Sequence, residues 1–157
     1  MTAKNLFKLS GCVMLTLVIG GVSGFLTKDS ITGWYATLVK PSFNPPNYVF
    51  GPVWTLLYIL MGISFYMILN TGAGRERTKC IAIFGGQLFL NFWWSIIFFN
   101  FHRICLAQME MALLWLSIIW MIIAFSRQNK AAGYLQIPYL LWVSFASALN
   151  FGILCLN

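Results

Sequence analysis

Five long apolar stretches constrain this sequence more than any other feature. Each is long enough to cross a bilayer, which takes about 20 residues of helix, and Glu110 is the only charged residue within them. Backbone groups in hydrocarbon must be hydrogen-bonded within the chain, so these stretches are expected to be helices. We therefore predict an all-α integral membrane protein, one domain over residues 1–157 with five transmembrane helices. The expected spans are about 9–26, 48–69, 80–101, 104–126 and 132–156.

The composition favours lipid over water as the surrounding medium. Apolar residues make up 60% of the chain and charged residues 8%, whereas soluble domains carry about 25% charged residues. The net charge of +7 could suggest nucleic acid, but the basic residues lie mostly between the apolar stretches and form no continuous basic stripe. We therefore expect the lipid bilayer, and no nucleic acid, as a partner.

Basic residues are distributed unequally between the two ends of the expected bundle. Seven fall on the side of the N-terminus and three on the other side, so the positive-inside rule predicts that the N-terminus lies inside. The long connection over residues 28–47 would then lie outside. The seven are Lys4, Lys8, Arg75, Arg77, Lys79, Arg127 and Lys130, and the three are Lys28, Lys40 and Arg103.

The sequence gives no sign of a metal site or a disulfide framework. Its four cysteines lie within or beside apolar stretches and form no CxxC pair, and His102 is the single histidine. We interpret His102 as a loop residue, with an axial haem ligand as the alternative. No metal site and no required cofactor are predicted.

The connection before the second span is stiff and rich in aromatic rings. It reads "WYATLVKPSFNPPNYVFGPVW" over residues 34–54, and its prolines forbid a helix through the middle. Its rings could be an interfacial aromatic belt or a rigid lid over a cavity. We expect a stiff cover over the outer end of the bundle.

Three spans carry aromatic and polar residues at helical spacing, so that each set lies on one face. Polar groups in a membrane turn toward partners or cavities rather than lipid. Three such faces predict a flat, apolar pocket with a few hydrogen-bonding groups, suited to a planar hydrophobic ligand of several fused rings. The sets are Phe50, Trp54 and Tyr58; Gln87, Asn91, Trp94 and Phe98; and Tyr139, Trp142, Ala146 and Leu149 or Asn150.

Other features have more than one interpretation. Glu110 is expected to reach toward water near Arg103, with a proton-coupled carboxylate as the functional alternative. Gly20 and Gly24 form a GxxxG pair that would let helices approach closely. Pro138 is expected to kink the fifth span.

Three segments resemble the translocator protein (TspO/MBR) family, also called tryptophan-rich sensory protein or peripheral benzodiazepine receptor. They are "WYATLVKPSFNPPNYVFGPVWTLLYILMG", "QLFLNFWWSIIFF" and "PYLLWVSFASALNF". The resemblance implies five transmembrane helices, frequently a homodimer, and binding of protoporphyrin IX, haem and synthetic drugs such as benzodiazepines. Ala82 and Gly86 match a close-packing motif proposed for that dimer.

The resemblance also implies roles for individual residues. Trp54 and Trp142 match positions linked in bacterial relatives to light-dependent porphyrin breakdown, so they are catalytic candidates if that reaction occurs. Ala146 matches the alanine whose change to threonine alters ligand affinity in the human protein. The expected ligand-binding residues are Phe50, Trp54, Tyr58, Asn91, Trp94, Phe98, Trp142, Ala146 and Leu149.

The sequence departs from the family pattern in two places. Ser42 and Phe43 stand where the family usually has tryptophan, and no Lys or Arg follows residues 149–151, so the animal cholesterol motif is broken. We therefore expect a microbial member in a bacterial envelope membrane rather than a mitochondrial outer membrane.

Three functions remain open at this point. The first is a receptor or transporter that binds porphyrins for sensing, transport or regulation. The second is a light- and oxygen-dependent porphyrin-degrading enzyme. The third is a small proton-coupled drug exporter that uses Glu110.

Overall fold

The computed structural model describes residues 2–157, and within that part of the chain all regular secondary structure is helical. Most of the helices are long, and two short ones lie in connections. They are α1 (Ala3–Thr32), α2 (Trp34–Thr37), α3 (Asn47–Leu69), α4 (Arg75–Ser95), the π-helical turn η1 (Ile96–Asn100), α5 (Ile104–Gln128), α6 (Lys130–Tyr134) and α7 (Ile137–Leu156).

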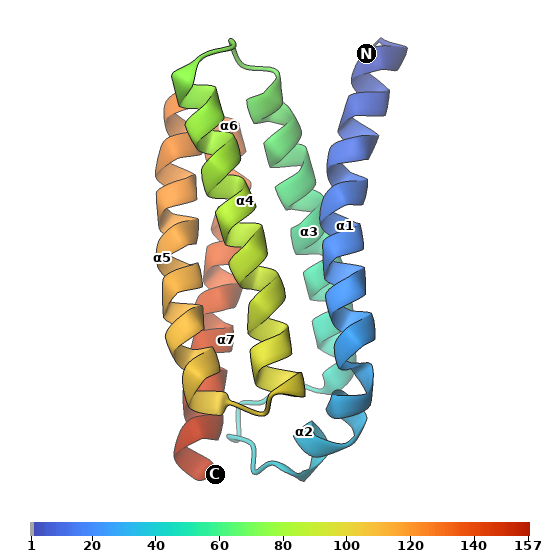
Figure 1. Cartoon of the computed structure of the whole chain (residues 1–157), viewed down its shortest axis with the longest axis vertical. Coiled ribbons are helices and arrows are strands. Elements are labelled where there is room, and N and C mark those ends of the chain that lie inside the picture. The colour runs from blue at the N-terminus through green and yellow to red at the C-terminus, as the bar shows by residue number, and fades with distance from the viewer. Residues whose placement is uncertain (1) are drawn as a thin grey trace.

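The long helices form a single up-and-down bundle (Figure 1). α1 packs mainly on α3, α4 packs on α5, and α5 also contacts α6 and α7, while α1 closes the bundle against α4 and η1. The N-terminus lies at one end, and α2 and the C-terminus lie at the other (Figure 1). Five helices are long and apolar enough to cross a membrane: α1, α3, α4 with η1, α5, and α6 with α7. The predicted all-α, five-helix fold is confirmed.

The connection between the first two spans differs from the expectation. α1 continues to Thr32 and α2 covers Trp34–Thr37, so the loop expected over 28–47 is non-helical mainly over residues 38–46. The reason is the position of the prolines. Because a proline disfavours helix at itself, at the residue before it and at the carbonyl four residues earlier, Pro41 permits helix as far as Thr37, where α2 ends.

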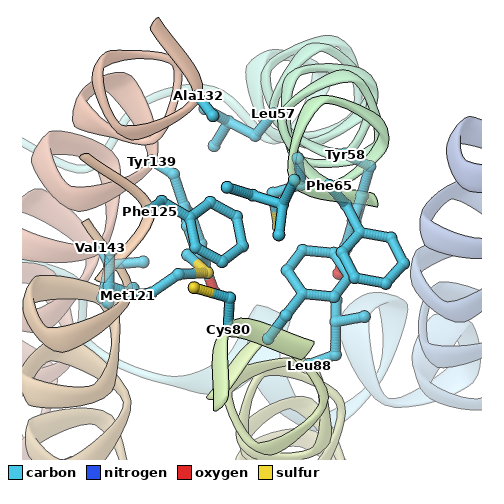
Figure 2. Close-up of a cluster of buried hydrophobic side chains, with 14 of the residues drawn as sticks. Leu57, Tyr58, Phe65, Cys80, Leu88, Met121, Phe125, Ala132, Tyr139 and Val143 are labelled. Atoms are coloured by element: carbon cyan, nitrogen blue, oxygen red, sulfur yellow. The ribbon is translucent and has the colours of Figure 1, made fainter. Parts of the chain in front are cut away.

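The half of the bundle away from α2 has a solid core. Phe65 and Phe84 stack with ring centroids 4.2 Å apart, and Phe125 lies 6.2 Å beyond Phe84. Met61 and Met121 are completely buried beside them. Figure 2 shows side chains from several helices converging on this cluster. Close packing of this kind is typical of protein interiors.

A glycine places α1 and α3 in direct backbone contact in this half. A Cβ at Gly62 would lie 2.6 Å from the Cα of Val13. Nearby, the Thr16 hydroxyl donates a hydrogen bond of 2.7 Å to the Tyr58 carbonyl. The close approach expected at Gly20 and Gly24 is only partly found: a Cβ at Gly20 would collide with the Tyr58 ring, but the space beside Gly24 is open.

The fifth span is broken rather than kinked. α6 ends at Tyr134 and α7 begins at Ile137, with Pro138 in its first turn. A proline is tolerated there because first-turn N–H groups have no partner within the helix. The break therefore lies just ahead of the proline.

Candidate functional site

A cavity of about 390 Å³ lies between α1, α3, the end of α4 with η1, and α7 at the α2 end of the bundle. Its volume falls in the range of about 300–1,000 Å³ that is usual for ligand pockets. All the residues that the sequence predicted as ligand-binding line this one cavity. They are Phe50, Trp54, Tyr58, Asn91, Trp94, Phe98, Trp142, Ala146 and Leu149.

Aromatic rings form a third of the cavity lining, and six of them lie in three pairs. On α3, Trp54 stacks on Tyr58 with centroids 5.6 Å apart. Trp94 stacks on Phe98 at 5.4 Å with the two planes only 18° apart. In the third pair, Phe50 meets Trp142 edge to face at 5.8 Å. These stacked rings give the cavity flat walls.

Three buried polar atoms on this wall lack a hydrogen-bond partner among residues 2–157. They are the indole N–H groups of Trp94 and Trp142 and the Oδ1 atom of Asn150. Asn150 is only 3% exposed, and its amide nitrogen donates to Gln108 at 2.7 Å. Because buried polar groups are nearly always paired, a ligand that offers both an acceptor and a donor could pair with these atoms once the side chains turn toward the cavity.

A hydrogen-bond chain runs from the cavity wall into the core. The Tyr58 hydroxyl donates to Asn91 Oδ1 at 2.5 Å, and the Asn91 amide nitrogen donates to the Tyr139 hydroxyl at 2.9 Å. The Tyr139 hydroxyl donates in turn to Gln87 at 3.1 Å. Gln87 and Tyr139 therefore hold the wall in place from behind rather than line it.

α1 supplies one side of the cavity, and the sequence prediction did not include it. Ser23 and Thr27 line the cavity and are buried, with 4% and 2% of their surface exposed. Gly20, Gly21 and Gly24 lie on the same side. The spacing of Ser23 and Thr27, one helical turn apart in an apolar span, was a signal for an inward-facing stripe.

The segment over residues 38–46, here called the cap segment, is fixed to its surroundings. Asn157 accepts a hydrogen bond from the Val39 N–H and donates one to the Val39 carbonyl, both at 3.0 Å. The Tyr35 hydroxyl donates to Asn44 at 3.1 Å, and burial raises the pKa of Tyr35, which keeps the proton on that hydroxyl. The cap segment is therefore tied to both α2 and the end of α7, although none of its residues lines the cavity, so a cover over the cavity stays a prediction.

The rings of the proline-rich connection have different positions. Four rings precede Phe50 in this connection, those of Trp34, Tyr35, Phe43 and Tyr48, and of these Tyr35 alone lines the cavity. Trp34 stacks on His102 with centroids 4.2 Å apart, while Phe43 and Tyr48 are 51% and 79% exposed. The connection thus combines one cavity-lining ring with surface rings.

Glu110 does not reach toward water as expected. It is 8% exposed, and neither carboxyl oxygen has a partner among the described residues, Arg103 included. The reason is its place on α5, since Ala107, Met111 and Leu114 bury the same face in the bundle. Glu110 does not line the cavity.

The predicted dimer residues lie away from the cavity. Ala82 and Gly86 are both exposed on α4, and the space beside Gly86 is open. A partner subunit at this surface stays a prediction.

Comparison with known proteins places the chain among relatives of similar length. The TspO/MBR family model matches residues 12–156. The tryptophan-rich protein TspO of Chlorobaculum tepidum is 41% identical over 155 residues, which cover 98% of each chain. TspO of Archaeoglobus fulgidus is 41% identical over 98% of this chain and 99% of its own, and the translocator protein of Sus scrofa is 32% identical over 85% and 83%.

Proposed function

Because this chain belongs to the TspO/MBR family, we propose that it is a receptor or transporter-like protein that binds porphyrins in the cavity. Protoporphyrin IX or haem is the ligand, for tetrapyrrole sensing, transport or regulation. The chain is a multi-pass integral membrane protein of bacterial type. The inner location of its N-terminus stays a prediction.

One observation carries this proposal: stacked rings and unpaired polar atoms share one cavity. Flat aromatic walls favour stacking on a conjugated macrocycle. The unpaired indole N–H groups of Trp94 and Trp142 can donate to a carboxylate or carbonyl, and the Asn150 oxygen can accept from an N–H. A porphyrin acid supplies a flat body and such groups at its edge.

Titration of the purified protein with protoporphyrin IX tests the proposal. We expect quenching of tryptophan fluorescence with a Kd of about 1 µM or tighter, which corresponds to about −8 kcal/mol or better. Quenching that is no stronger than that of free tryptophan in the same detergent would contradict porphyrin binding.

Ala146→Thr tests whether the binding site is this cavity. Ala146 is half-buried in its wall, so the added hydroxyl and methyl group would crowd a flat ligand. We expect a loss of about tenfold in affinity, or about 1.4 kcal/mol. Ala148→Thr is the matched control, because Ala148 is exposed on the same helix. Equal affinities in both variants would place the ligand elsewhere.

The positions of Trp54 and Trp142 favour porphyrin photodegradation as a second candidate. Both indoles line the cavity, so an excited porphyrin would have an electron donor against it, with O₂ as the oxidant. Trp54→Phe and Trp142→Phe should slow the bleaching of bound porphyrin under light, whereas Trp120→Phe, at an exposed position, should not. Equal bleaching in all of them and in detergent alone would exclude the enzyme.

Proton-coupled export has weaker support. Glu110 would be the coupling acid, but its side chain does not line the cavity. Uptake of porphyrin into proteoliposomes with and without a pH gradient tests this function. Flux that depends on the gradient and is lost in Glu110→Gln would favour export.

A further inference from the structure

The cavity opens sideways rather than through its end. Most of the residues that line it are buried or half-buried, and those that are exposed all come from two helices. We call these exposed lining residues the portal residues. They are Gly21 and Gly24 on α1 and Asn47, Gly51 and Thr55 on α3.

The end of the bundle offers a ligand less access. The cap segment crosses there and is tied by both Asn157 hydrogen bonds and by the Tyr35 bond to Asn44. Pro41 also lies close against α7, since a Cβ at Gly152 would come within 3.1 Å of its ring. Entry from this end would require several contacts to break together.

Small residues leave space at the side opening. A Cβ at Gly21, Gly24 or Gly51 would meet no atom within 4 Å. The neighbouring side chains Val22 and Leu56 are 45% and 56% exposed, so the rim of the opening is apolar. Both helices are long and apolar enough to span the membrane, and the rim therefore faces lipid.

The interior beyond the opening contains groups that need a ligand. Asn150, 3% exposed, lines the cavity with an unpaired amide oxygen, and the Trp142 indole N–H is also unpaired. An open seam of small residues thus leads from lipid to unpaired polar atoms.

The geometry points to a lateral portal between α1 and α3 through which a flat, hydrophobic ligand enters the cavity from the bilayer. This inference rests on the proposed binding function. A ligand with a large apolar surface partitions into the bilayer, so its supply there exceeds that in water. The portal residues set the rate of entry, and the aromatic wall sets the affinity.

Larger side chains at the portal test the inference. The variants are Gly24→Leu and Gly51→Leu, singly and combined. A Cβ at either position meets no neighbouring atom, so these variants should fold. Gly11→Leu is the matched control, because Gly11 is exposed with open space beside it but lies outside the cavity lining. Each variant is reconstituted into vesicles, and its thermal unfolding is compared with that of the wild type.

Stopped-flow tryptophan quenching then measures the rates. Protoporphyrin IX is supplied in one of two ways. It is either dissolved in protein-free vesicles of the same lipid composition as those that carry the protein, or added from aqueous solution. We expect association and dissociation rate constants to fall together by about tenfold or more in the double variant, with Kd changed by about twofold or less. Gly11→Leu should keep wild-type rates, and Asn157→Ala, which releases the cap segment, should also keep them.

Different failures have different meanings. Wild-type rates in the double portal variant, or faster entry in Asn157→Ala, would overturn the lateral portal and leave porphyrin binding intact. Weaker affinity from faster dissociation alone would show that the new side chains fill the cavity, and would also overturn it. A wild-type protein that binds no porphyrin would overturn the proposed function and the portal together.

Discussion

The two halves of this bundle use the same helices in opposite ways. Away from α2, rings and methionines of α3, α4 and α5 pack closely, as in the Phe65–Phe84 stack at 4.2 Å, and an open apolar groove lined by α1 and α4 lies beside them. Toward α2, the helices separate around a cavity of about 390 Å³. The comparison indicates that packing in one half stabilises the bundle, and that the other half can therefore contain a cavity.

Glycines show the same contrast along the α1–α3 interface. Gly62 in the solid half lets the two backbones touch, whereas Gly24 and Gly51 in the hollow half face open space. The same residue type therefore serves close packing in one half and access in the other.

The largest expected effect comes from emptying the solid half. Phe84→Ala removes a ring that is 2% exposed and stacked between two others. We expect a loss of about 3–5 kcal/mol in the free energy of unfolding, measured by denaturant titration in detergent. Phe89→Ala on the same helix, at a position 63% exposed, should cost less than about 1 kcal/mol. Similar losses in both would mean that the core does not dominate stability.

The second-largest loss of stability is expected from a larger side chain at the contact between α1 and α3. Gly62→Val places a side chain against the backbone of Val13, and we expect a loss of about 1–3 kcal/mol as a lower thermal midpoint. Gly51→Val provides the comparison in the hollow half, where no clash exists. A thermal midpoint lowered equally by both substitutions would contradict the claim that the two halves differ in packing.

An effect of similar size is expected where the two halves meet. Tyr58→Phe leaves the Asn91 Oδ1 atom without its donor, and a buried acceptor without a partner costs about 1–3 kcal/mol. Because the Tyr58 ring remains, the cavity keeps its wall. Both unfolding and porphyrin titration should be measured, with the exposed Tyr48→Phe as control. Unchanged stability would show that the hydrogen-bond chain does not support the wall.

The smallest global effect is expected at the cap segment. Asn157→Ala removes two partly exposed hydrogen bonds to Val39, a loss of about 1 kcal/mol or less. The local effect should be larger, because hydrogen exchange in residues 38–46 should speed up while α3 stays protected. Exchange at the wild-type rate would show that other contacts fix the segment.

Periodicity and motif together predicted most of the site. Trp54 and Tyr58, one turn apart, had to share a face of α3, and polar Asn91 had to turn away from lipid. These rules act within one helix and need no knowledge of the neighbours. The lining residues on α3, α4, η1 and α7 could therefore be predicted from the sequence.

Features that depend on contacts between helices could not be predicted from the sequence. Gly20 and Gly24 had the same local pattern, yet one meets the Tyr58 ring and the other meets open space. Glu110 was expected at the surface because its burial depends on how α5 is rotated against its neighbours. Local spacing cannot fix such rotations, since each is decided by the whole interface.

The π-helical turn before α5 determines how the cavity wall would respond to the loss of one residue. Phe101 donates its N–H to the carbonyl of Ile96 at 3.0 Å, five residues back, so this turn holds one residue more than an α-helical turn. Deleting a single residue from 96–100 would remove this extra residue and restore regular α-helical winding, with a neighbouring residue taking the place of the deleted one. If Phe98 is the residue that is deleted, a neighbour such as Phe99 would take its position on the cavity wall. Relatives or designs that are shorter by one residue here should be expected to present a different ring to the ligand.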